Sequence, residues 1–309
     1  MTQARSLSVA DRKLSMTAAQ LRKWLVGSGV VTPTGFGFGG TLALSLLLTG
    51  GPVWSLAIVS WLIVYSSYLI DSLSEIDDFD DSLSSERTRH LFAQRNFLAI
   101  AGVGSFLSAM AITALVTNLA YAAFLLIFPI AVALYALPIL SLISAGRLRW
   151  KCIKDIPYVK SFYTAFFWGL LGIFAVAYLG CAARVGVVLA AFMLFAFKVF
   201  IGTVYCDLKD IGRDRAAGVV NFAVSLGRER VLRLLTWLNW TTPFLLFVPV
   251  WAGVLPGAAL FLSLTVVYAH MVFLAAGSPG ADDEWLSNVV ADAEWLLWPL
   301  YVVLGMSVL

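Results

Sequence analysis

The sequence predicts an all-α, polytopic membrane protein with nine transmembrane helices in a single domain, 1–309. Its composition is the first indication, because 61% of the 309 residues are hydrophobic and only 13% are charged. A soluble domain is about half apolar and about a quarter charged. Long apolar runs and an uneven placement of basic residues are the second and third indications. Together they exclude a water-soluble globule and a disordered chain.

About twenty apolar residues cross a bilayer as a helix. By that measure the sequence predicts spans at 28–48, 52–70, 96–117, 120–143, 160–180, 185–205, 231–251, 254–275 and 289–308. Barrel strands would be about ten residues long and would alternate in polarity, so unbroken runs of this length favour helices. In the first span, we expect the closely spaced glycines between Gly35 and Gly40 to serve close helix packing.

The basic residues predict the orientation of the chain. All but two of the 21 Lys and Arg residues, Arg184 and Lys198, lie in or beside the N-terminal arm and the segments that follow spans 2, 4 and 6. The positive-inside rule places these segments, 1–24, 71–95, 144–159 and 206–230, in the cytoplasm. We therefore expect a multi-pass protein of the cell (inner) membrane with a cytoplasmic N-terminus. The acidic segment after span 8 is an exception on the same side.

An acidic cluster follows span 2. Asp71, Glu75 and Asp78 stand at i, i+4 and i+7, which is one face of a helix that continues out of the membrane. For the neighbouring stretch 77–81, solvated loop charges are an equally good interpretation. Within this cluster, either Asp71 and Glu75 or Asp71 and Asp78 supply the metal ligands.

A second acidic cluster follows span 6, with Asp207, Asp210 and Asp214 at i, i+3 and i+7. Aligned carboxylates repel each other unless a counterion is present, and Mg²⁺ binds carboxylates together with substrate phosphates. Two such faces opposed at the cytoplasmic rim would hold Mg²⁺ around a diphosphate. The expected metal ligands are Asp71, Glu75, Asp78, Asp207, Asp210 and Asp214.

The second cluster resembles a known motif. The pattern Asp207-x-Lys209-Asp210-x-x-x-Asp214-Arg215-x-x-Gly218, followed by Leu226-Gly227, is similar to the second aspartate-rich motif of the UbiA superfamily of intramembrane prenyltransferases. The first motif of that family, Asn-Asp-x-x-Asp-x-x-x-Asp, is divergent, because Ser67, Tyr68, Asp71 and Glu75 stand at its positions. Nine spans with these loop positions resemble a UbiA-like bundle over nearly the whole chain.

The resemblance implies transfer of an isoprenyl group from an isoprenyl diphosphate to a lipophilic acceptor, aromatic or lipid, with release of diphosphate. It implies Mg²⁺ as the cofactor and catalytic roles for Asp71, Asp210 and Asp214. The predicted diphosphate contacts are Lys160, Lys209 and Arg215, although interfacial snorkelling is an alternative for Lys160. The expected partners are the two substrates and membrane lipid, with no nucleic acid.

Two alternatives stay open at this point. A membrane terpene cyclase on the same scaffold would differ only in its product. A secondary transporter would need ionisable residues near the middle of its spans, whereas Lys198 is the single one expected there. Asp292 and Glu294 near the start of span 9 either line a polar acceptor pocket or lie in the headgroup zone.

Overall fold

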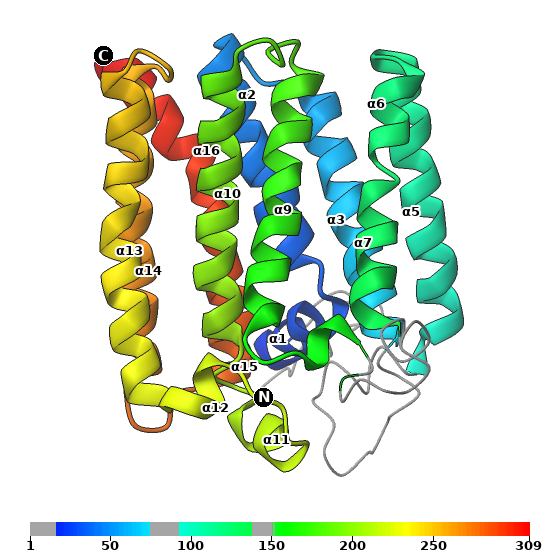
Figure 1. Ribbon diagram of the computed structural model, residues 1–309, viewed down its shortest axis with the longest axis vertical. Coiled ribbons are helices and arrows are strands. Elements are labelled where there is room, and N and C mark those ends of the chain that lie inside the picture. The colour runs from blue at the N-terminus through cyan, green and yellow to red at the C-terminus, as the bar shows by residue number, and fades with distance from the viewer. Residues whose placement is uncertain (1–16, 75–92, 138–149, 151) are drawn as a thin grey trace, which may run out of the picture.

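The computed structural model describes residues 17–74, 93–137, 150 and 152–309. These residues form a bundle of long, roughly parallel helices, as the all-α prediction requires (Figure 1). No strand occurs in the described part of the chain. The main hydrophobic core runs through the bundle and includes large, fully buried side chains such as Phe128, Phe174, Phe195 and Trp298.

Eight helices in the described residues are long and apolar enough to cross a membrane, and a bent pair supplies a ninth span. The eight are α3 (Trp54–Ser74), α5 (Arg95–Val116), α6 with α7 (Leu119–Phe124, Ile127–Ala136), α9 (Val159–Tyr178), α10 (Val185–Cys206), α13 (Arg228–Trp251), η5 with α14 (Gly257–Ser263, Leu264–Ala276) and α15, η6 and α16 (Asp283–Trp285, Leu286–Val290, Ala291–Val308). The described residues thus give eight spans, or nine when the bent pair is counted as one, in agreement with the predicted polytopic bundle.

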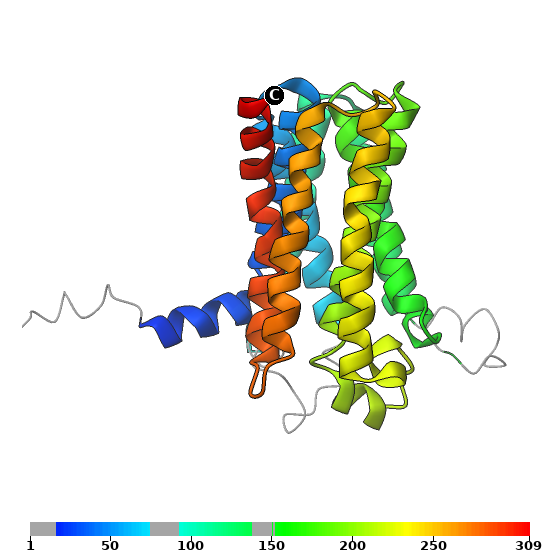
Figure 2. The same ribbon diagram turned by 90° about the vertical axis from the view of Figure 1, so that its left-hand side faces the viewer.

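The first span differs from the straight helix expected over 28–48. It consists of a π-helical segment, η2 (Pro33–Gly40), that continues into α2 (Thr41–Thr49). A 65° bend separates it from α1 (Ala18–Ser28), which lies across the end of the bundle (Figure 2). Gly29, with φ 60°, ends α1 and permits this change of direction.

The glycines of η2 allow its backbone to touch two neighbouring helices. A Cβ atom at Gly37 would lie 2.8 Å from the carbonyl oxygen of Ser60 in α3. At Gly39 it would lie 2.5 Å from the carbonyl oxygen of Trp295 in α16. Any larger side chain would push these helices apart, so the close-packing interpretation of the glycines is confirmed.

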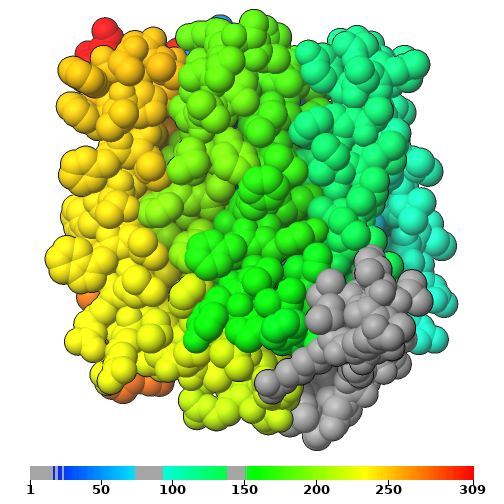
Figure 3. Space-filling view, in the orientation of Figure 1, coloured from blue at the N-terminus to red at the C-terminus, as the bar shows by residue number. Residues whose placement is uncertain are grey.

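One end of the bundle gathers the segments predicted to share a side of the membrane. The ends of α3 and α10 lie there with α1 and two short helices, α11 (Ile211–Ala216) and α12 (Phe222–Leu226), while the C-terminus lies at the other end (Figure 1). We call the former the capped end. Above it, α13, α10 and α9 cover one face of the molecule side by side (Figure 3). Which side of a membrane the capped end faces stays a prediction.

The acidic turn between α14 and α15 also lies at the capped end. Asp283 accepts two hydrogen bonds from the guanidinium group of Arg228, at 2.6 and 2.7 Å. Its neighbour Asp282 forms an ion pair with Arg22 of α1. The exceptional acidic loop of the sequence is therefore matched to basic residues of α1 and α13.

Candidate active site

An ion pair between α9 and the end of α10 forms the centre of the candidate site. Nζ of Lys160 lies 2.7 Å from Oδ1 of Asp207, which directly follows the last residue of α10. Asp207 is 1% exposed, and its second oxygen, Oδ2, is buried without a hydrogen-bond partner among the described residues. A buried carboxylate oxygen that lacks a partner is costly, and a bound cation would remove that cost.

The backbone at the start of α9 fixes the position of Lys160. Tyr158 adopts a left-handed conformation with φ 64°. Its N–H donates to the carbonyl oxygen of Val220 at 3.2 Å, and its hydroxyl lies 3.1 Å from Oγ of Ser225. The segment before α9 is thus tied to the segment around α12. Lys160, two residues further on, is held over the end of α10.

The second acidic cluster does not lie on one continuous helix, which corrects the expected single face. The chain leaves α10 at Cys206, turns through 207–210 and re-enters a helix at Ile211. The break relieves the repulsion that three stacked carboxylates would cause. Asp210 stays half-buried, with Oδ1 3.2 Å from the guanidinium of Arg213.

Asp214 is more buried than a solvent-reachable rim residue would be, at 8% exposed. Nδ2 of Asn221 donates a hydrogen bond to its Oδ2 at 2.7 Å. Asn221 also caps α12, because its Oδ1 accepts from the N–H of Val224 at 2.8 Å. One amide side chain therefore joins the carboxylate of α11 to the start of α12.

Burial raises the pKa of Asp207 and of Asp214 above the ordinary value for aspartate, against the opposing effect of the Lys160 charge. The negative charge of Asp210 adds to the increase at both residues. Asp207 and Asp214 thus respond to the same lysine, and both respond to the charge of Asp210. Such a set of oxygen ligands, with one buried oxygen unpaired, fits a hard divalent cation.

These ligands are not sufficient on their own. Within the described residues, no three His, Cys, Asp or Glu side chains lie close enough together to hold a metal ion. A cation here would take its remaining ligands from phosphate oxygens, from water or from the first cluster, as Mg²⁺ commonly does.

The first cluster is described only in part. Asp71 is half-buried near the C-terminal end of α3, at the same end of the bundle as Asp207 (Figure 1). Glu75 and Asp78 lie outside the described residues. Their role as metal ligands opposite the second cluster stays a prediction.

The three basic residues predicted to contact diphosphate are placed differently. Lys160 contacts Asp207, as described above. Nζ of Lys209 donates to Oδ1 of Asn288 at 2.6 Å, which ties the turn after α10 to η6. Arg215 is exposed on α11. Lys160 is thus the one that the structure brings to the carboxylates.

The sequence interpretation missed three residues that shape the site: Tyr158, Asn221 and Asn288. Asn221 precedes a short apolar run, and that is the usual pattern of a helix N-cap. Its second role, as donor to Asp214, depends on how the short helices fold back. Tyr158 and Asn288 act through contacts between distant segments, for which the local sequence carries no signal.

The position of Glu294 differs from what the sequence predicts. Lys198 was expected to be the single ionisable residue deep in the spans, but its Nζ lies 2.6 Å from Oε1 of Glu294 in α16. Both residues are buried inside the bundle, at 4% and 7% exposed. Of the two interpretations for Glu294, the structure favours a polar pocket over the headgroup zone.

Comparisons with known proteins agree with this architecture at the level of the fold. No family model and no curated protein matches the sequence. Among solved structures, a UbiA homologue from Aeropyrum pernix without ligand matches with a TM-score of 0.57 at 17% identity, over 95% of this chain and 99% of that chain. A UbiA homologue from Archaeoglobus fulgidus bound to GPP and Mg²⁺ matches with a TM-score of 0.51 at 19% identity, over 94% and 96%.

The described helices therefore form a polytopic bundle with the UbiA fold. This confirms the resemblance that the second aspartate-rich motif predicts, as far as the fold is concerned. In this chain the motif-bearing end of α10 lies at the capped end, beside the lysine that begins α9.

Proposed function

We propose that this protein is an Mg²⁺-dependent prenyltransferase of the UbiA superfamily. It transfers an isoprenyl group from an isoprenyl diphosphate to a lipophilic acceptor and releases diphosphate. The observation that carries the proposal is the cluster of Asp207, Asp210 and Asp214 beside Lys160, at one end of a UbiA-fold bundle. The UbiA homologue from Archaeoglobus fulgidus, bound to GPP and Mg²⁺, supports the choice of ligands.

The residues that would hold Mg²⁺ are the three acids of the second cluster together with Asp71, Glu75 and Asp78. Bound Mg²⁺ neutralises the charge of the diphosphate and so makes it a better leaving group. The structure supports Asp207 most strongly, because its Oδ2 is buried without a hydrogen-bond partner among the described residues.

The chain's own residues supply three further requirements of this chemistry. Lys160 keeps a positive charge beside the carboxylates, where it can also pair with phosphate oxygens. The apolar bundle keeps water away from a reactive allylic cation. Aromatic side chains line the core near the first and last spans, where the ring of Phe36 lies 4.8 Å from that of Trp295 and 5.4 Å from that of Trp168. Their faces can stabilise positive charge.

The orientation proposed for the protein follows from the same site. We place the capped end and the N-terminus in the cytoplasm, in the cell (inner) membrane of the source cell, because the basic segments gather there. The diphosphate then enters from the aqueous side while its isoprenyl tail lies among the spans.

The test is turnover by the purified protein. It is incubated with geranyl diphosphate or longer homologues and a membrane extract, with Mg²⁺ or with EDTA, and diphosphate and prenylated lipids are measured. We expect diphosphate and prenylated lipids to form in the presence of Mg²⁺ and not in EDTA. Diphosphate release with a cyclic hydrocarbon and no prenylated acceptor would identify a cyclase instead. Absence of Mg²⁺-dependent diphosphate release would contradict both.

The first cluster is tested in the same assay by Asp71→Asn, Glu75→Gln, Asp78→Asn and, as the control, Asp80→Asn. We expect the loss to be largest at Asp71, which is nearest the membrane, and smallest at Asp80. Excess Mg²⁺ should partly restore the Asp71 variant, and moderate salt should mask the loss at Asp80. Equal small losses in all four variants would remove the first cluster from the metal site.

A further inference from the structure

A second polar site lies inside the bundle, deeper along α10 than the carboxylates of the capped end. Its centre is the ion pair between Lys198 of α10 and Glu294 of α16. Asn239 of α13 is a third member, because its Oδ1 lies 3.5 Å from Nζ of Lys198 and its Nδ2 donates to the carbonyl oxygen of Val266. Helices α10, α13, α14 and α16 thus meet at one polar network.

A buried ion pair needs a reason other than stability. Removing two charges from water costs as much as their attraction returns, and an apolar pair of similar size often stabilises a protein more. Ionisable residues within transmembrane helices are accordingly rare and typically mark ligand or ion sites. Neither Lys198 nor Glu294 takes part in the chemistry proposed at the capped end.

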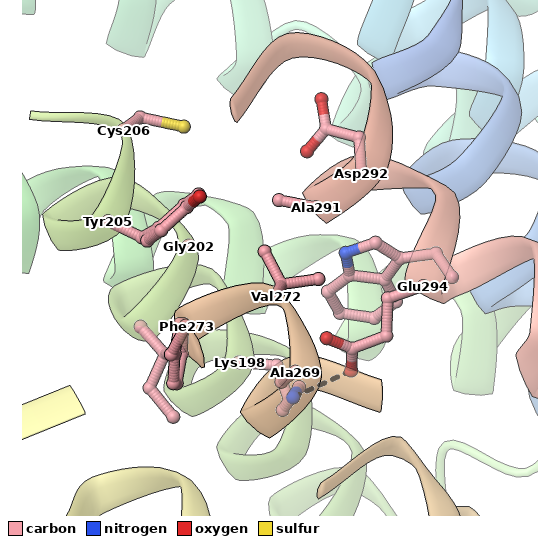
Figure 4. A pocket seen from close by; sticks show the side chains of 12 residues that line it. Lys198, Gly202, Tyr205, Cys206, Ala269, Val272, Phe273, Ala291, Asp292 and Glu294 are labelled. Atoms are coloured by element: carbon pink, nitrogen blue, oxygen red, sulfur yellow. Dashed lines mark ion pairs between the residues drawn. The ribbon is translucent and has the colours of Figure 1, made fainter. Parts of the chain in front are cut away.

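A cavity of about 40 Å³ adjoins the ion pair between α10, α14 and α16. Its walls are apolar on the side of α14, where Ala269, Val272 and Phe273 line it. Figure 4 shows Lys198 and Glu294 at one end of the space and Asp292 at the other. The carboxylate of Glu294 uses one oxygen for Lys198, while its other oxygen points toward the space between the helices (Figure 4).

Gly202 keeps this cavity open. It lies inside α10, where glycine lowers helix stability relative to alanine. A Cβ atom added there would meet no heavy atom within 4 Å, because the position faces the cavity. Helix α10 therefore has a glycine, which lowers its stability, at the position where a larger side chain would fill the space beside Lys198.

The charges of the cavity select the ligand. A carboxylate ligand would meet the negative charges of Glu294 and Asp292, and an ammonium ligand would meet Lys198. A hydroxyl group fits both, because it can donate to the oxygen of Glu294 and accept from the ammonium of Lys198. The volume admits a few water molecules, or a hydroxyl group with the atoms next to it.

We propose that this cavity binds the hydroxylated head of a neutral lipophilic molecule, with the hydroxyl group at the Lys198–Glu294 ion pair. Resting on the proposed function, we further assign that molecule as the acceptor of the isoprenyl group, because the cavity extends along α10 from Lys198 to Cys206, the residue before Asp207. A phenol and an aliphatic alcohol share the required chemistry. A hydroxyl-free hydrocarbon end does not match the charges of the cavity.

Direct binding tests the proposal without any turnover. Radiolabelled para-nonylphenol is bound to the protein in lipid nanodiscs, with empty nanodiscs as the background. Unlabelled para-nonylphenol, dodecanol and nonylbenzene then compete for the site. We expect para-nonylphenol to compete and nonylbenzene, which lacks the hydroxyl, to compete about tenfold less well or not at all. If dodecanol competes, an aliphatic alcohol is sufficient for binding. If dodecanol does not compete, the site requires a phenol.

Two variants locate the binding. Gly202→Leu should fill the cavity and Glu294→Gln should remove the charge, and each should weaken para-nonylphenol binding about tenfold or more. Asp283→Asn is the matched control, because it breaks an ion pair of the same length, 2.6 Å, outside the cavity. Gly202→Ala replaces the leucine variant if the latter does not elute as a single species.

Binding of geranyl diphosphate with Mg²⁺ is measured in parallel on the same preparations. Unchanged diphosphate binding together with lost phenol binding in Gly202→Leu supports the cavity. Equal phenol binding in Gly202→Leu, Asp283→Asn and the unaltered protein overturns it, as does equal competition by nonylbenzene. The unaltered protein could bind para-nonylphenol, lose that binding in Gly202→Leu, and yet bind no geranyl diphosphate. In that case the cavity proposal stands and the prenyltransferase proposal fails.

Discussion

Asn221 donates a hydrogen bond from Nδ2 to Oδ2 of Asp214 at 2.7 Å, and Oδ1 of the same side chain caps α12. Asp214, the last acid of the second cluster, is thus held by the segment around α12 that follows it. Because Tyr158 is bonded to Val220 in that segment, the lysine of α9 and the acid of α11 are fixed by one connected structure. Disturbing either part should change the site as a whole.

The raised pKa of Asp214 gives a pH prediction. Because burial raises this pKa in the folded protein above that in the unfolded chain, its contribution to stability is present at low pH. That contribution is lost as pH rises through the raised pKa. Asp214→Asn cannot ionise, so in EDTA its Tm relative to the unaltered protein should increase between about pH 4 and pH 7. A difference in Tm that stays constant with pH would contradict this.

Loss of the Lys160 charge should affect both binding and stability. Lys160→Met leaves Asp207 buried without its cation, which should cost about 1–3 kcal/mol, less than for a fully buried pair because Lys160 is partly exposed. Binding of geranyl diphosphate with Mg²⁺ should fall about tenfold. Arg230→Met, at an exposed position of α13, is the control and should change neither quantity. Recovery of binding in Lys160→Arg would separate charge from packing.

Asp210 is the best position for separating catalysis from folding. Its side chain is 20% exposed and pairs only with nearby Arg213 in the described structure, so Asp210→Ala should leave Tm within about 1 °C. Diphosphate release should nonetheless fall by about a hundredfold or more, as expected for a lost metal ligand. Arg213→Ala removes the same surface pair and serves as the control. Near-normal turnover in Asp210→Ala would exclude Asp210 as a metal ligand.

The glycines of η2 should be intolerant of a single methyl group. Gly39→Ala places a Cβ against the backbone of Trp295 and should cost about 1–3 kcal/mol. Gly104→Ala in α5, where no atom lies within 4 Å, should be neutral or slightly stabilising. Thermal unfolding of the two proteins in the same detergent measures the difference. Equal values of Tm in the two variants would mean that η2 and α16 can move apart without a loss of stability.

The proposed orientation is tested by cysteine accessibility. In a protein with Cys152, Cys181 and Cys206 replaced by serine, a cysteine at Asp81 or at Arg213 should react only with reagents that reach the cytoplasm. A cysteine at Ala182, in the turn between α9 and α10 at the far end, should react only from outside. Opposite accessibility of positions 81 and 213 would exclude a site shared by the two acidic clusters.

The spans could be predicted from the sequence because hydropathy depends on each residue and not on its partners. The expected ranges 160–180 and 185–205 agree closely with α9 and α10. Details that depend on packing could not be predicted in this way. The first span contains a π-helical segment whose glycines pack against α3 and α16, and α16 is distant from it in the sequence.

The candidate site shows the same division. The acids of the second cluster follow from a local motif, whereas Lys160 was one of three basic candidates until the structure placed it on Asp207. The single helical face expected for the acids was wrong, because the spacing of the acids does not show that the helix ends at Cys206 and a new one begins at Ile211. The Lys198–Glu294 pair joins residues 96 positions apart, and the sequence therefore gave no indication that they meet.

The contact of η2 with α16 has a consequence for how the protein is made. The first span is rich in small residues and packs through its backbone against α16, which lies about 250 residues further along the chain. During synthesis the first span therefore enters the membrane before one of its principal partners exists. Closure of the bundle is then a late event, completed only after α16 has been inserted. Chains truncated before α16 would leave the N-terminal span exposed to membrane quality control, although no residue of that span had been altered.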